Sequence, residues 1–66
     1  MFILISYDIP NDKRRTKIHK ILKDFGTCIQ YSVFECEIKE KEYLKLRHRL
    51  KKKIDPSEDS LSFYFL

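Results

Sequence analysis

Segments with strand-like and with helix-like periodicity alternate along these 66 residues, and their order restricts the possible folds more than any other feature. Apolar, β-branched and aromatic residues fill positions 2–9, which is typical of a central strand covered on both faces. This predicted strand ends near Asp8. Residues 27–38 are again rich in β-forming side chains but too few for two long strands, so they predict a tight hairpin that turns near residues 31–32. Residues 61–66 form the last predicted strand.

Two segments between these strands have apolar residues at helical spacing. The first begins at an N-cap provided by Asn11 or Asp12, and Gly26 is its expected C-cap. The second runs from Glu40 and stops before Pro56, with an apolar stripe opposite a row of cations. The first stripe comprises Ile18, Ile21, Leu22 and Phe25, the second comprises Tyr43, Leu46, Leu50 and Ile54, and the cations are Lys41, Lys45, Arg49 and Lys52.

The predicted order is strand, helix, strand, strand, helix, strand, which is the ferredoxin-like βαββαβ arrangement of the α+β class. An antiparallel four-stranded sheet would have both helices on one face. Residues 1–66 are expected to form one domain of marginal stability, because so short a chain buries only about 60% of the surface of its unfolded form. Apolar residues on the other sheet face need a cover, so we expect a homodimer, joined face to face or edge to edge.

Positive charge is concentrated on the two predicted helices. The formal net charge is +4, yet residues 11–25 and 40–53 carry thirteen Lys or Arg against four Asp or Glu. Such clustering attracts a polyanion, although charged helix faces are often only solvated. In the second helix Lys45, Arg49 and Lys52 share one face, because they are four and three residues apart, and this row is expected to follow a phosphate backbone.

Several other classes of protein are disfavoured. Cys28 and Cys36 lack the spacing of a zinc site, so we expect free thiols, although the two could face each other across the hairpin. No apolar run is long enough to span a membrane, and the apolar start at residues 1–5 is too short for a secretory signal. We therefore expect a protein of a reducing cytoplasm.

Asp8 is the strongest candidate for a chemical role, because it lies at the carboxyl end of the first predicted strand. It either caps the turn before the helix or takes part in catalysis. Mg²⁺ keeps several waters and accepts one or two carboxylates together with substrate phosphates. If the two-fold axis of a dimer passes near Asp8, two symmetry-related carboxylates could hold one Mg²⁺ that activates water.

Arginine and aromatic side chains near Asp8 in the sequence could contact nucleic acid. Arg14 and Arg15 lie in the first helical turn, where cations do not favour helix stability and where free N–H groups attract anions, so we expect them to contact phosphate. Tyr7, Tyr31 and Phe34 could stack on bases, although packing is the commoner role of aromatic residues in a small core.

The remaining candidates are expected to have no catalytic role. The positions of His19 and His48 on the basic helices predict no contact with a water near Asp8, so we expect surface or hydrogen-bonded histidines. Glu35 and Glu37 alternate on one strand face and are expected to be solvated.

Four short motifs follow one another along the chain. They are Tyr7-Asp8-Ile9 at a strand end, Arg14-Arg15, the stretch QYSVFEC at residues 30–36, and Asp55-Pro56 with Glu58-Asp59-Ser60. In this order, over essentially the whole chain, they resemble the CRISPR-associated protein 2 family. The resemblance implies a ferredoxin-like homodimer, with Mg²⁺-dependent phosphodiesterase activity on RNA or DNA in some members. It also implies a part in spacer acquisition, in which the dimer bridges copies of the CRISPR-associated protein 1 integrase and holds captured DNA.

The resemblance also assigns residues. Asp8 matches the metal-binding aspartate of the family, and the positions around its site are matched by Tyr7, Arg14, Ser32 and Phe34. Members of the family usually continue into a fifth strand that packs on the neighbouring protomer, so this chain, which stops at Leu66, is expected to lack that strand. Three functions stay open: a metal-dependent endonuclease, a non-catalytic scaffold between integrase and DNA, and a toxin-like ribonuclease. Phosphate contacts do not distinguish RNA from DNA.

Overall fold

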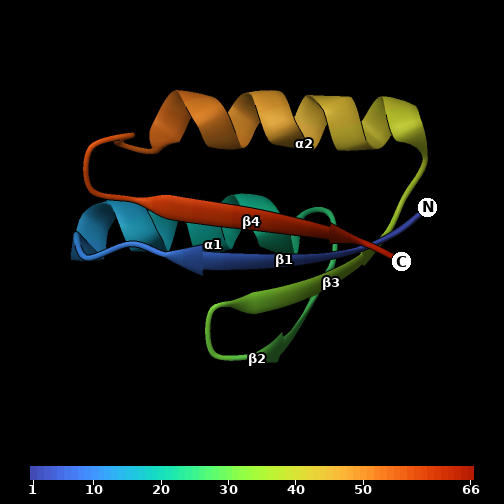
Figure 1. Cartoon of the computed structure of the whole chain (residues 1–66), viewed down its shortest axis with the longest axis horizontal. Coiled ribbons are helices and arrows are strands. Elements are labelled where there is room, and N and C mark those ends of the chain that lie inside the picture. The colour runs from blue at the N-terminus through green and yellow to red at the C-terminus, as the bar shows by residue number, and fades with distance from the viewer.

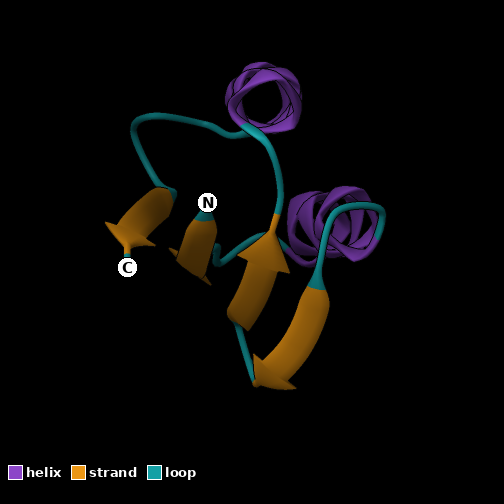
Figure 2. Cartoon of the chain, turned by 90° about the vertical axis from the view of Figure 1, so that its right-hand side faces the viewer, coloured by secondary structure: helices purple, strands orange, loops and turns teal.

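The computed structural model describes residues 1–66 and contains the predicted elements in the predicted order. The strands are β1 (Phe2–Asp8), β2 (Thr27–Gln30), β3 (Val33–Glu37) and β4 (Ser60–Phe65), and the helices are α1 (Asp12–Lys23) and α2 (Glu40–Lys53). The strands form one antiparallel sheet in the order β2-β3-β1-β4. Both helices lie on the same side of this sheet and run in opposite directions (Figure 1, Figure 2). The predicted ferredoxin-like fold is therefore confirmed. Neither helix has the length and apolar character needed to cross a membrane.

The core lies between the helices and one face of the sheet. Strand β1 is hydrogen-bonded to β3 on one edge and to β4 on the other, and every second residue of it faces the helices. The buried residues of the core are Ile3, Ile5, Tyr7, Ile9, Ile18, Ile21, Leu22, Phe34, Cys36, Ile38, Leu46 and Leu50. On the opposite face, called the open face below, Leu4 and Ser6 are only half-buried and Asp8 is exposed. Within one protomer, the cover predicted on both faces of β1 is present on the helix side only.

Helix α1 ends without the glycine cap that the sequence predicts. Asp24 is the C-cap residue, in the right-handed helical conformation, and Gly26 has no positive φ angle. A Cβ atom at Gly26 would instead lie 2.5 Å from Cys36 Sγ and closer still to the carbonyl oxygen of Glu35. The predicted C-cap role of Gly26 is therefore wrong. The residue is a glycine because strand β3 passes against its backbone.

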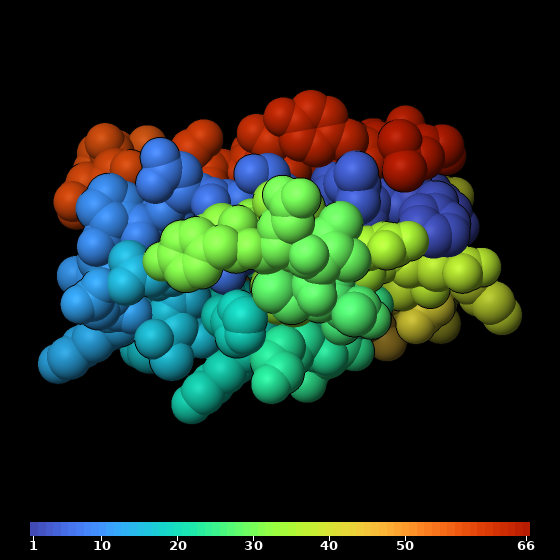
Figure 3. Space-filling view, turned by 90° about the horizontal axis from the view of Figure 1, so that it is seen from below, coloured from blue at the N-terminus to red at the C-terminus, as the bar shows by residue number.

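The hairpin between β2 and β3 turns at Tyr31 and Ser32, as predicted. Ser32 has a φ angle of 64°, in the left-handed region, and its carbonyl oxygen accepts a 3.1 Å hydrogen bond from the Tyr7 N–H, which ties the turn to β1. The strand register shifts between Cys28 and Gln30, which marks a bulge. In Figure 3 the hairpin, in green, projects in front of β1 and α1. Both cysteines are free, as expected.

Candidate functional site

Asp8 is an exposed carboxylate at the end of a rigid strand. It is the last residue of β1, it pairs with Ser60 of β4, and it lies on the open face of the sheet. Its side chain has no hydrogen bond or ion pair within the protomer. The residue that caps α1 is Asn11, whose Oδ1 accepts a 2.9 Å hydrogen bond from the Arg14 N–H. The alternative that Asp8 is only a helix cap is therefore wrong.

A metal site at Asp8 needs donors from outside the protomer. No three His, Cys, Asp or Glu side chains lie close enough together to hold a metal ion. Asp8 alone supplies one carboxylate, and a hard cation such as Mg²⁺ accepts one or two carboxylates, completing its shell with water and phosphate oxygens. The donor chemistry of Asp8 therefore fits Mg²⁺ when a substrate phosphate, or Asp8 of a second copy, provides the other ligands.

Arg14 is paired inside the protomer. Its Nε donates to Asp59 Oδ2 at 2.7 Å and its Nη2 donates to Asp59 Oδ1 at 3.0 Å, with Glu58 at 3.5 Å. The Asp59 side chain is fully buried and also accepts a 2.8 Å hydrogen bond from the Asp55 N–H. The Arg14 hydrogen bond lowers the pKa of the Asp59 carboxyl. Arg14 thus links α1 to the segment before β4, and the phosphate contact expected of it stays a prediction.

Arg15 is also used within its own segment. Its Nη1 donates to the carbonyl oxygen of Ile9 at 3.0 Å, and its Nη2 pairs with Asp12. These contacts fix the connection between β1 and α1, so Arg15 holds the chain that follows Asp8. This structural role was not predicted from the sequence, and the expected contact of Arg15 with phosphate stays a prediction.

A small cavity lies on the helix side of β1, beside the hairpin turn. Its volume is about 160 Å³, and it is lined by Tyr7, Arg15, Thr16, His19 and Tyr31. Tyr7 Oη lies 3.2 Å from His19 Nδ1, within hydrogen-bond distance, and burial is the main cause that raises the pKa of Tyr7. The expectation that His19 is a hydrogen-bonded histidine is confirmed.

The three aromatic candidates have different environments. Phe34 is 0% exposed, and its ring packs 6.4 Å from that of Tyr7 and 5.1 Å from that of His19. Phe34 therefore cannot stack on a base. Its role near Asp8 is to pack against the ring of Tyr7. Of the three candidates, Tyr31 is the one that a ligand can reach, because it is 84% exposed at the turn, next to Ser32.

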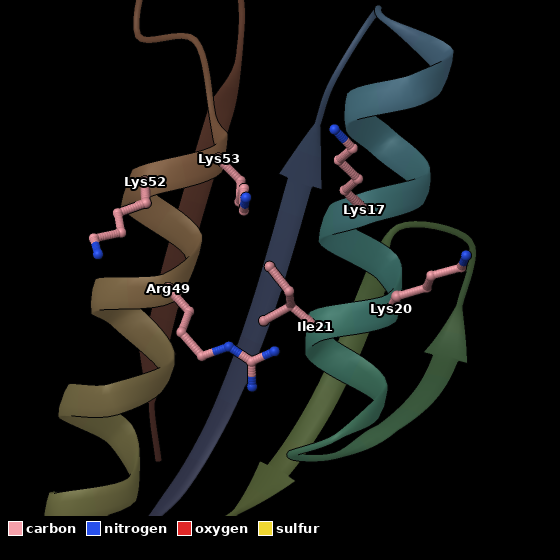
Figure 4. A pocket seen from close by; sticks show the side chains of 6 residues that line it. All are labelled: Lys17, Lys20, Ile21, Arg49, Lys52 and Lys53. Carbon is pink, nitrogen blue, oxygen red and sulfur yellow. The ribbon is translucent and has the colours of Figure 1, made fainter.

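Five cations line a groove between the two helices. The groove has a volume of about 250 Å³ and is lined by Lys17, Lys20, Ile21, Arg49, Lys52 and Lys53 (Figure 4). It brings together two of the three predicted cations of α2, whereas the third, Lys45, is exposed outside it. Lys17, Lys20 and Lys53 were not among the residues predicted from the sequence to contact phosphate. The sequence places Lys17 and Lys20 beside the apolar residues Ile18 and Ile21. It does not indicate which edge of α1 packs against α2.

Comparisons with known proteins give one consistent result. The family model for CRISPR associated protein Cas2 matches residues 1–66. The CRISPR-associated endoribonuclease Cas2 3 of Chloroflexus aurantiacus is 48% identical over 66 residues, which are 100% of this chain and 71% of that relative. The crystal structure of Streptococcus pyogenes Cas2 at pH 6.5 has a TM-score of 0.92 and 37% identity, covering 100% of this chain and 86% of that one. The hypothetical protein TT1823 from Thermus thermophilus has a TM-score of 0.95 and 38% identity, with coverage of 98% and 79%.

Proposed function

Because the chain belongs to the CRISPR-associated protein Cas2 family, we propose that it is a Mg²⁺-dependent endonuclease that cleaves phosphodiester bonds of RNA or DNA as a homodimer. Relatives are named endoribonuclease or endonuclease, which supports a nuclease in general. The observation that supports the finer proposal is Asp8, an exposed carboxylate without a partner at the end of β1.

The role proposed for Asp8 is to hold a negative charge at a fixed place. Strand β1 is hydrogen-bonded on both edges, and the turn at Ser32 is tied to Tyr7, so the backbone that positions Asp8 is rigid. Mg²⁺ bound there would polarise a phosphate oxygen and lower the pKa of a bound water. Asp8 would orient that ion, and the basic surfaces of the protein would attract the phosphate backbone.

The homodimer is proposed through the open face of the sheet. On this face Phe2 is 37% and Tyr64 is 56% exposed, and two further apolar side chains are half-buried: Leu4, which pairs with Tyr64, and Val33 on the neighbouring strand β3. Joining two such faces would remove this apolar surface from water. Because Asp8 lies at one end of the same face, a two-fold axis near that end would bring two carboxylates together.

The test compares Asp8→Asn with the parent on matched RNA and duplex DNA, in Mg²⁺ and in EDTA. The amide keeps the shape of the side chain but lacks the charge that a hard cation needs, so cleavage should be lost while nucleic-acid affinity stays. Glu37→Gln is the matched control, because it removes one negative charge from the exposed end of β3 on the same face. Full activity of Asp8→Asn would refute the catalytic role.

A second candidate function is a non-catalytic scaffold. It is favoured by the groove cations, which belong to the helix layer and so lie on the side of the sheet opposite Asp8. In this proposal the dimer holds DNA and, as family membership suggests, bridges copies of the CRISPR-associated protein 1 integrase during spacer acquisition. A parent protein that binds DNA with no cleavage in Mg²⁺, and an Asp8→Asn variant that binds it equally well, would support the scaffold.

A further inference from the structure

The groove between α1 and α2 holds more positive charge than the protomer neutralises. Arg49 has one acidic partner, Asp24 at 3.5 Å, and both side chains are largely exposed. None of the four lysines has a carboxylate partner. In Figure 4 the side chains of Lys17, Arg49 and Lys53 extend into the space between the helices, whereas the amines of Lys20 and Lys52 point outward. Three cations from two helices, of which only Arg49 has an acidic partner, therefore face the same groove.

Packing in the core holds the two walls of this groove in place. Ile21 is buried and forms the apolar floor, and Leu22 and Leu50 anchor the two helices in the core. The guanidinium of Arg49 lies 5.6 Å from the centre of the Phe25 ring, so Phe25 and Asp24 together orient it. A cationic groove with a rigid frame matches the way in which proteins follow a nucleic-acid backbone.

The groove is separate from the proposed catalytic carboxylate. The helices cover one side of the sheet (Figure 2). The alternation along β1 places Asp8, its last residue, on the other side. A phosphate chain in the groove cannot touch Asp8 of the same protomer without passing around the edge of the sheet. Binding in the groove is therefore expected to be independent of chemistry at Asp8.

We propose that the groove between α1 and α2 binds the sugar-phosphate backbone of one single-stranded nucleic-acid segment, held apart from Asp8. Nucleic acid is chosen as the polyanion because of the function proposed above, so this inference rests on that function. The groove holds only about 250 Å³, and the cations on its two walls can contact the phosphates of one backbone that lies along it. A duplex, whose major groove alone is about 12 Å wide, is too thick to lie in this groove and would meet chiefly the outward amines of Lys20 and Lys52.

The test neutralises the three inward cations together, in Lys17→Gln/Arg49→Gln/Lys53→Gln. The matched control is Lys39→Gln/Arg47→Gln/Lys51→Gln, which also removes one Arg and two Lys but none of the groove lining. Affinity for a labelled oligo-dT or oligo-U, and for a duplex of the same length, is measured by fluorescence anisotropy at several salt concentrations. Circular dichroism of each variant checks that it is folded.

The groove variant should have a shallower dependence of log affinity on log salt for single strands. Three lost contacts at about 0.7 each flatten the slope by about 2, so that the loss of affinity between 50 and 200 mM salt is about twentyfold smaller than in the parent. Lys53→Gln alone should flatten it by about 0.7, which keeps the test valid if the triple variant does not fold. The control should keep the slope of the parent.

Parallel lines for the parent and the groove variant would overturn the proposal, and so would an equal flattening in the control. A larger effect on duplex than on single strands would overturn the assignment of a single strand. The proposed nuclease fails separately, through absence of Mg²⁺-dependent cleavage by the parent or full activity of Asp8→Asn. If the parent does not cleave but the groove variant has lost single-strand binding, the nuclease proposal fails and the groove proposal is supported.

Discussion

Replacing Phe34 with alanine removes the largest of the fully buried side chains in the core. Truncation of a buried Phe to Ala costs about 3–5 kcal/mol, because it leaves a cavity under the rings that Phe34 contacts. A 66-residue chain, at about 0.05–0.15 kcal/mol per residue, has a free energy of unfolding of only about 3–10 kcal/mol. Phe34→Ala should therefore remove at least about a third of the stability and lower the Tm by about 12 °C or more, since each kcal/mol shifts it by about 4–8 °C in a domain of this size.

A more conservative substitution distinguishes a packing role of Phe34 beside Tyr7 from a contact with the ligand. Phe34→Leu keeps more of the buried side chain and should cost less than Phe34→Ala, so it can be assayed in the folded state. Urea unfolding followed by circular dichroism, at matched protein concentrations, measures both variants. Phe34→Leu should bind and cleave nucleic acid as the parent does. If it is as stable as the parent but has lost binding, Phe34 contacts the ligand and its assignment to the core alone is wrong.

Two further predictions concern contacts that join distant segments. Gly26→Ala should lower the urea midpoint by the equivalent of about 1–3 kcal/mol, because its Cβ would overlap Cys36 and the β3 backbone, and an unchanged midpoint would show that β3 moves aside freely. The pKa of Asp59 is lowered by Arg14 from an ordinary value of 3.8, so this pair contributes stability at higher pH and loses it as the pH falls through the lowered pKa. Below about pH 4, the free energy of unfolding should therefore fall less steeply with decreasing pH in Asp59→Asn than in the parent. An equally steep fall in the variant would contradict this role.

The sequence was sufficient for the fold because the signals for each element are local. Apolar runs and helical stripes lie within single segments, and the hairpin turn follows from the shortness of residues 27–38. The misassigned detail at Gly26 has a different origin. A glycine after a helix usually reports the left-handed cap, but here the close approach of β3, nine residues further on at Glu35, requires it.

The candidate site was predictable only where a single residue defines it. Asp8 lies at a strand end that the sequence locates, and the structure adds that this residue is exposed and lies on the open face. Arg14 and Asp59 are 45 residues apart, and their bidentate pair depends on how the segment before β4 folds back onto α1. The groove likewise depends on packing, because the spacing of Lys17 within α1 contains no information on its distance from Lys53.

The separation of Asp8 from the groove makes a quantitative prediction about how their effects combine. Association of two copies through the open face would place both Asp8 residues at one end of the interface and both grooves on the outer surfaces, since the helices lie on the side away from that face. Substitutions more than about 7–10 Å apart without shared partners add within about 0.3–0.5 kcal/mol. The binding free energies of parent, Asp8→Asn, the groove variant and their combination, measured for one single-stranded oligonucleotide in EDTA, should therefore be additive. A coupling larger than about 0.5 kcal/mol would mean that one strand contacts both places at once, and the two sites would then form a single path around the edge of the sheet.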